Sequence, residues 1–188
     1  FGSISLLSDP AASAILDIVA AHRPRAVVTL DPNCRPNLTP DRGAYRTFLR
    51  ERCIPLAHLL KVSDQDLAWL EPGRAHADVA ADWLAKGPSA VIVTAGEKGA
   101  TLFRANAEPM HVMPPVVDVI DTVGAGDTFT AAAMCGLLES GIDSAVALSA
   151  MSDAQWMRVL RFAASAAALN CTRAGANPPH RTELGPLQ

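Results

Sequence analysis

The sequence predicts an α/β fold, a Rossmann-like three-layer sandwich in which a mostly parallel sheet is flanked by helices. Apolar, β-patterned runs alternate with amphipathic helical patterns along the 188 residues, as expected for strands joined by crossover helices. The run SAVIVTAG at 89–96 is apolar without alternation, which is typical of a central strand covered on both faces. Hydrophobic residues make up 49% of the chain, enough for a substantial core.

Each element follows from local signals. Ser8 and Asp9 offer a helix cap before Pro10, and Thr39, Pro40 and Asp41 open another helix with one apolar face. In the first half we expect strands at 1–7, 25–31 and 59–63, and helices from 10 to 21, from 41 to 53, around 64–70 and at 76–86.

In the second half, EKG turns the chain from the strand at 89–96 into an antiparallel partner, ATLFRA, at 100–105. We expect a Pro-rich loop at 113–115 and then helices at 124–139, 143–151 and 153–169. No repeat or linker divides the chain, so residues 1–188 are predicted to belong to a single domain.

Charge and hydropathy exclude two classes of partner. The net charge is −3, and the arginines at 35, 42, 46, 50 and 52 are interleaved with Asp41 and Glu51, so we expect no nucleic-acid binding. No apolar stretch reaches the roughly 18 residues that span a bilayer, and no signal peptide is seen, so we expect a cytoplasmic protein without membrane contact. The chain starts at Phe1 inside a strand-like segment, and we therefore expect a fragment.

The stretch DTVGAGDTFTAAAM at 121–134 carries the strongest chemical signal. Two glycines precede an alanine-rich helix, and unpaired amides at a helix N-terminus bind phosphate when no side chain crowds them. Asp127 falls in the first turn, where a carboxylate can accept a proton from an attacking hydroxyl. A carboxylate is a weak base and must accept that proton late, which suits phosphoryl transfer. Taken alone, the same residues also suit an ordinary capped helix.

This stretch resembles the signature of the ribokinase-like, or PfkB, carbohydrate kinases. VTAGEKGA at 93–100, DPNCRP at 31–36 and NCTRAGANPP at 170–179 also resemble segments of that family. KVSDQDLAWL at 61–70 looks most like bacterial fructokinases. The resemblance implies a ribokinase-like fold of which only the C-terminal portion is present, without the N-terminal strands and the lid.

The resemblance also implies roles for single residues. Asp127 would be the catalytic base, the amides of Gly124, Ala125 and Gly126 would form an anion hole, and the turn carrying Thr94, Gly96 and Gly99 would hold ATP. A structural turn between two strands is the alternative for that last segment.

Metal and substrate contacts are less sharply predicted. The family's NxxE motif falls on Ser63 and Asp66, which are shorter than Asn and Glu, so a Mg²⁺ contact would pass through water, and a plain helix cap is the alternative. Asp121 aligns with a K⁺-site position, and the sequence leaves K⁺ dependence open. Arg35 is predicted either to contact substrate or to form an ion pair with Asp31 or Asp41.

The resemblance thus implies an ATP-dependent sugar kinase with fructose as the first candidate substrate. Phosphorylation of 2-keto-3-deoxygluconate is the alternative, and a non-catalytic nucleotide-binding fragment is the alternative of another class. The expected partners are a small sugar and ATP. A second copy of the chain or the missing N-terminal portion is left open as a further partner.

Overall fold

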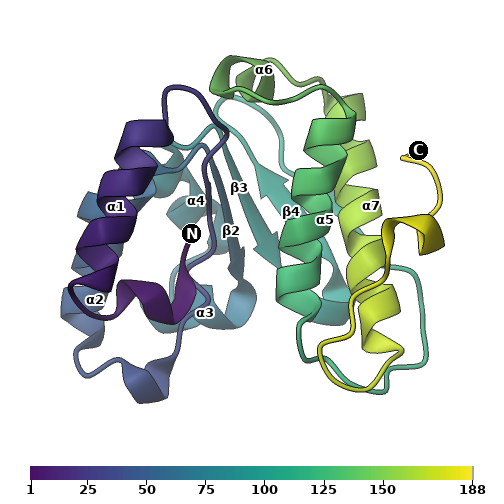
Figure 1. The fold of residues 1–188 in the computed structure, drawn as a ribbon, viewed down its shortest axis with the longest axis horizontal. Helices are drawn as coiled ribbons and strands as arrows, with labels where there is room; N and C mark the ends of the chain where they lie inside the picture. The colour runs from purple at the N-terminus through teal and green to yellow at the C-terminus, as the bar shows by residue number, and fades with distance from the viewer. Residues whose placement is uncertain (188) are drawn as a thin grey trace.

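The computed structural model describes residues 1–187 and contains one five-stranded sheet with the strand order β1-β2-β3-β4-β5. β1 pairs parallel with β2 and β2 with β3, whereas β4 and β5 are antiparallel to their neighbours. The mixed, mostly parallel α/β architecture is therefore confirmed (Figure 1). The strands are β1 (Thr29–Leu30), β2 (Leu59–Ser63), β3 (Ala90–Thr94), β4 (Ala100–Phe103) and β5 (Met110–Val112).

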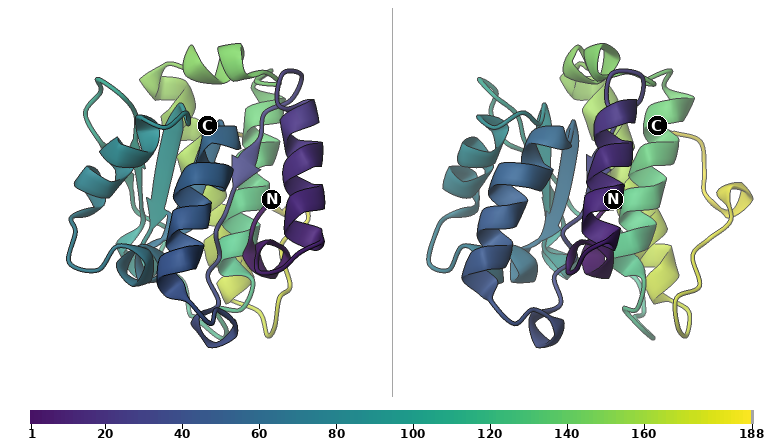
Figure 2. Two further views of the ribbon diagram at one scale, coloured as in Figure 1. Left: turned by 90° about the vertical axis from the view of Figure 1, so that its left-hand side faces the viewer. Right: turned by 60° about the vertical axis from the view of Figure 1, so that its left-hand side comes forward.

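Helices cover both faces of this sheet, as the two turned views in Figure 2 show. One face packs against the first four helices and the other against the last three. The helices are α1 (Ala11–His22), α2 (Arg42–Phe48), α3 (Asp64–Leu70), α4 (His76–Leu84), α5 (Ala125–Glu139), α6 (Ala145–Ser149) and α7 (Asp153–Cys171).

Successive residues of the central strands serve opposite cores, because side chains alternate across a sheet. In β3, Ala90 and Ile92 lie in the core shared with α5 and α7, whereas Val91 and Val93 lie in the core shared with α4. β3 is buried on both faces, as its unbroken apolar run predicts. In β2 the alternation places Lys61 on the α5 side of the sheet.

The expected strand at 1–7 is wrong beyond its first two residues. Gly2 makes an isolated parallel bridge to Asp31, but Ser3 then adopts φ 60° and the chain closes into a 3₁₀ turn at Ser3–Leu6. A positive φ interrupts an extended strand, so the apolar pattern alone overstated its length. The strand expected at 25–31 is correspondingly short, at Thr29–Leu30.

Two further differences involve short or distorted elements. β5 at Met110–Val112 was not predicted, because three residues carry almost no periodic signal and form a strand only by pairing with β4. The helix expected to run to residue 53 continues beyond α2 as a π-helical turn at Leu49–Cys53. Within residues 1–187, no helix combines the length and apolar character that crossing a membrane requires.

Candidate active site

The N-terminus of α5 has the geometry that an anion-binding turn requires. Gly124 is its N-cap with φ 77°, and a Cβ there would lie 2.9 Å from the Cβ of Ala176, so glycine is needed for both reasons. The Ala125 amide donates to the carbonyl of Thr122 at 3.2 Å. The amides of Gly124 and Gly126 have no acceptor among the described residues. Of the three expected anion-hole amides, two are therefore available and one is engaged in the turn.

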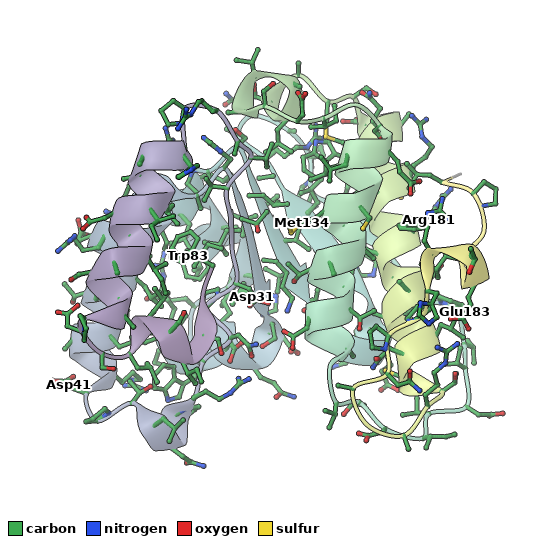
Figure 3. All side chains as sticks on the ribbon, in the orientation of Figure 1. Asp31, Asp41, Trp83, Met134, Arg181 and Glu183 are labelled. Carbon is green, nitrogen blue, oxygen red and sulfur yellow. The ribbon has the colours of Figure 1, made fainter. Side chains whose placement is uncertain are left out.

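Asp127 is the third residue of α5, and its side chain is exposed at a cleft of about 290 Å³. The cleft lies between the start of the chain, the end of β1 and the exposed side of α5, with Asp31 and Met134 on its walls (Figure 3). Asn33 Nδ2 donates to Asp127 Oδ1 at 3.3 Å. Asp127 thus faces open space rather than packed apolar side chains, as a base for an incoming hydroxyl requires.

A buried ion pair lies beside this carboxylate. Lys61 Nζ is 2.9 Å from Asp31 Oδ2, and their side chains are only 8% and 14% exposed. Thr130 from the second turn of α5 donates to the same oxygen at 3.4 Å. A methyl group at Gly126 would lie 3.0 Å from Lys61 Nζ, so this glycine makes room for the ammonium under the first turn of α5.

Sequence reasoning assigned no role to Lys61 or Asn33, and it considered Asp31 only as an ion-pair partner for Arg35. The available signal for Lys61 was a lysine inside the apolar strand LLKVS, since lysines are almost never fully buried without a partner. Asp31 and Asn33 stand in the DPN segment directly after β1, at the carboxyl edge of the sheet where α/β proteins bind ligands.

Arg35 forms neither of the ion pairs considered for it. Its Nη1 donates to Asn33 Oδ1 at 2.6 Å, to the Asn33 carbonyl at 3.1 Å and to the Cys34 carbonyl at 3.0 Å. Within residues 1–187 no carboxylate of Asp31 or Asp41 lies within ion-pair distance of it. The guanidinium therefore wraps the loop after β1, and its expected contact with substrate stays a prediction.

Ser63 and Asp66 show the helix cap that was the alternative for their motif. Ser63 Oγ accepts from the Asp66 amide at 3.0 Å at the start of α3, and Asp66 Oδ1 accepts from the Cys34 amide at 3.2 Å. Burial raises the pKa of the Asp66 carboxyl above its usual range. The Ser63 hydroxyl opposes this shift, and no described residue donates an ordinary-length hydrogen bond to Asp66 Oδ2, so this oxygen can take a metal-bound water.

The turn after β3 has left-handed glycines at both ends. Gly96 has φ 56° and open space where a side chain would stand, as suits close approach of a ligand. Gly99 has φ 88°, and a Cβ there would lie 2.0 Å from the Val112 carbonyl. The need for glycine at 99 therefore comes from packing against β5. Thr94 ends β3 in register with Ser63 of β2, so both lie at the same edge of the sheet.

Asp121 ties the loop before α5 to the loop after α7. Its two carboxylate oxygens accept from the amides of Val123 at 3.0 Å and Gly175 at 2.8 Å. These backbone hydrogen bonds hold the pKa of Asp121 below its usual range. Asn170 is fully buried and donates to the Val123 carbonyl at 2.9 Å. Groups of three or more His, Cys, Asp or Glu suited to a metal are absent from residues 1–187.

The structure thus brings Asp127 and Thr130 of α5 together with Asp31, Asn33 and Lys61, which are far from α5 in the sequence. The carboxyl ends of β1, β2 and β3 meet at one edge, which also places Ser63 and Thr94 there. An exposed carboxylate beside free helix amides suits proton abstraction next to a bound anionic group.

Comparison with known proteins gives a consistent result. Residues 2–183 match the model of the pfkB family carbohydrate kinases. A fructokinase of Rhizobium leguminosarum bv. trifolii is 37% identical over 140 residues, covering 73% of this chain and 41% of the relative. Probable fructokinase-3 of Arabidopsis thaliana is 34% identical over 193 residues, covering 100% of this chain and 52% of the relative.

Solved structures agree with these sequence relatives. The fructokinase of Xylella fastidiosa with bound ATP superposes with a TM-score of 0.83 at 25% identity, over 92% of this chain and 54% of the other. The aminoimidazole riboside kinase of Salmonella enterica, complexed with aminoimidazole riboside and an ATP analogue, superposes with a TM-score of 0.79 at 27% sequence identity. The match covers 94% of this chain and 56% of the other. The chain spans about half the length of the relatives it matches. The matched family model and these relatives together show that the chain belongs to the pfkB family of carbohydrate kinases.

Proposed function

We propose that the complete protein transfers the terminal phosphoryl group of ATP to a hydroxyl group of a sugar, with fructose as the first candidate. The observation that carries the proposal is the exposed carboxylate of Asp127 on the first turn of α5, beside helix amides without protein acceptors. The names of the relatives, which include fructokinases of bacteria and plants, favour fructose over 2-keto-3-deoxygluconate.

The proposed reaction assigns a step to each part of the site. The sugar oxygen forms a bond to the γ-phosphorus, the bond from that phosphorus to the bridging oxygen breaks, and ADP leaves with the electron pair. Asp127 accepts the hydroxyl proton as the new bond forms. The amides of Gly124 and Gly126 would stabilise the negative charge on the transferred group, and one such donor is typically worth about 3 kcal/mol.

The chain also has residues that fit the expected cofactors. Asp66 has one carboxylate oxygen to which no described residue donates an ordinary-length hydrogen bond, which suits a contact with Mg²⁺ through water. Bound Mg²⁺ would neutralise charge on the ATP phosphates. For K⁺ the fit is weaker, because both oxygens of Asp121 already accept backbone hydrogen bonds. Asp121 would then act by holding the surrounding carbonyls in place rather than as a ligand.

The decisive experiment compares the full-length protein with its Asp127→Asn variant, which keeps the shape of the side chain and removes the base. ADP release is measured with ATP and fructose, and separately with ATP and 2-keto-3-deoxygluconate. We expect turnover with fructose to fall at least 100-fold, about the contribution of a general base, while ATP affinity is kept. Wild-type turnover in the variant would refute the role of Asp127.

The two alternatives are separate outcomes of the same experiment. Faster ADP release with 2-keto-3-deoxygluconate than with fructose would change the substrate and keep the mechanism. If the wild-type protein binds ATP but releases no ADP with any sugar tested, it is a nucleotide-binding protein without kinase activity.

A further inference from the structure

We propose that Asn33 is a positioning residue that orients Asp127 for proton abstraction. The inference rests on the proposed function, since it assumes that Asp127 is the base. It starts from the hydrogen bond that Asn33 Nδ2 donates to Asp127 Oδ1 at 3.3 Å across the cleft. The bond joins the loop after β1 to the first turn of α5, two segments separated by 94 positions in the sequence.

The amide orientation of Asn33 is fixed by Arg35. The guanidinium can only donate, and its Nη1 lies 2.6 Å from Asn33 Oδ1, so this atom must be the amide oxygen. The NH₂ group of Asn33 therefore points to the other side, toward Asp127. A reversed amide would bring an NH₂ group against the arginine and an oxygen against a carboxylate, and both contacts are unfavourable.

The backbone of Asn33 is held as firmly as its side chain. It has φ 40°, a left-handed conformation that asparagine adopts more readily than most residues. Its amide donates to Asp31 Oδ1 at 3.1 Å. The other oxygen of Asp31 is held by Lys61 at 2.9 Å and by Thr130 at 3.4 Å. The buried ion pair thus anchors the loop that presents Asn33 to the cleft.

This arrangement divides the two oxygens of Asp127 between two tasks. Oδ1 accepts from Asn33, while Oδ2 has no donor among the described residues and is free to face the sugar hydroxyl. A carboxylate held by one oxygen loses rotational freedom about its terminal bond. Because misplacing a catalytic group by about 1 Å can cost 100-fold in rate, Asn33 is expected to act on kcat.

The test uses Asn33→Gly in the full-length protein, because glycine accepts φ 40° freely, so the backbone is kept while the side-chain amide is lost together with its contact to Arg35. We expect kcat for sugar phosphorylation to fall about 10- to 100-fold, with the KM values for ATP and sugar changed less than about twofold. Asn106→Gly is the matched control, since Asn106 also has a positive φ, 57°, but lies in the exposed turn between β4 and β5. It should leave kcat unchanged.

Asn33→Asp is the second variant, which keeps the shape and removes the donor. It should lower kcat at least as much as the glycine variant, because a second carboxylate oxygen would face Asp127. It also keeps the test decisive if the glycine variant folds poorly. Wild-type kcat in Asn33→Asp would overturn the inference.

A double-mutant cycle shows whether Asn33 acts through Asp127. In the Asp127→Asn background, Asn33→Gly should lower the remaining turnover by less than about twofold, because residues that act as a unit are not additive. An equal loss in both backgrounds would refute positioning while leaving the base assignment intact. Wild-type turnover of Asp127→Asn alone would instead refute the proposed function.

Discussion

The contribution of Lys61 to the stability of the protein depends on its partner. Lys61 is a charged residue within the buried, apolar strand β2, and the carboxylate of Asp31 balances the charge of its ammonium group. Removing one member of a buried pair leaves the other charge without compensation, which costs more than the pair itself contributes. Lys61 beside the candidate active site is therefore also needed for the stability of the folded protein.

We predict that Lys61→Met lowers the free energy of unfolding by about 3 to 5 kcal/mol, because Asp31 then stays buried without its cation. Urea unfolding followed by circular dichroism measures the change. The double variant Lys61→Met with Asp31→Asn should recover part of the loss. Equal stabilities of wild type and Lys61→Met would show that water already compensates Asp31.

Prediction from sequence worked at the residue scale where the chemistry is local. Gly124, Gly126 and Asp127 lie in one motif, and the structure places them at one helix start as expected. Lys61 and Asn33 were missed because their partners lie 30 and 94 positions away. No local pattern reports such contacts. Arg35 was noticed, but its wrapping around its own loop depends on the left-handed turn at Asn33.

Elements with strong internal signals were predicted well. β2 has the predicted bounds, Leu59–Ser63, and α7 begins at the predicted residue, Asp153, behind a capping box formed by Ser152 and Gln155. β1 and β5 were predicted poorly, because such short strands are defined by their neighbours in the sheet rather than by their own composition. Periodicity reports burial of an element but not its pairing partners.

The hairpin of β4 and β5 offers a test at this scale. Gly99→Ala should destabilise the protein by more than 3 kcal/mol, because its Cβ would overlap the Val112 carbonyl at 2.0 Å in addition to the strain of φ 88°. Gly73→Ala is the matched control, with φ 76° and no atom within 4 Å of the new Cβ. It should cost only about 1 kcal/mol. Thermal unfolding of the two variants compares them directly.

The cap of α7 gives a smaller and independent effect. Ser152 Oγ accepts from the Gln155 amide at 3.3 Å, and the Ser152 amide donates to Gln155 Oε1 at 2.9 Å. Ser152→Ala should lower the free energy of unfolding by about 1 kcal/mol, because one amide at the helix start loses its acceptor. Chemical denaturation measures the change, and no change would mean that water replaces the cap.

At the scale of the whole molecule, His58 makes the stability of the fold depend on pH. It is buried before β2, and its Nδ1 accepts from the Val28 amide at 3.1 Å, which requires the neutral ring. Desolvation, followed by the charge of Arg23, lowers the pKa of His58 below its usual value of 6.5. The neutral ring therefore belongs to the folded state, while the unfolded chain protonates first as the pH falls.

We predict that stability falls as the pH drops below about 6.5, because the unfolded chain then binds more protons at position 58. The loss should level off once the pH is below the lowered folded pKa. Unfolding measured from pH 8 to pH 5 should show a weaker slope in His58→Asn than in wild type. Equal slopes in His58→Asn and wild type would contradict the prediction.

The fold of the whole chain followed from the alternation of strands and helices, and the family followed from the motif at 121–134. The expected domain assignment, a C-terminal portion of one ribokinase-like domain, stays a prediction. The identity of the sugar also stays a prediction, since the chain spans about half of its relatives.

The buried pair of Lys61 and Asp31 and the half-buried amide of Asn33 lie in one network, but natural selection should treat them differently. A lineage that abandoned phosphoryl transfer would still need the pair in order to fold, whereas position 33 would need only a residue that accepts its positive φ. Among descendants that have lost Asp127, we therefore expect position 33 to vary while 31 and 61 persist. Such a pattern would distinguish residues that are kept for folding from a residue that is kept for catalysis.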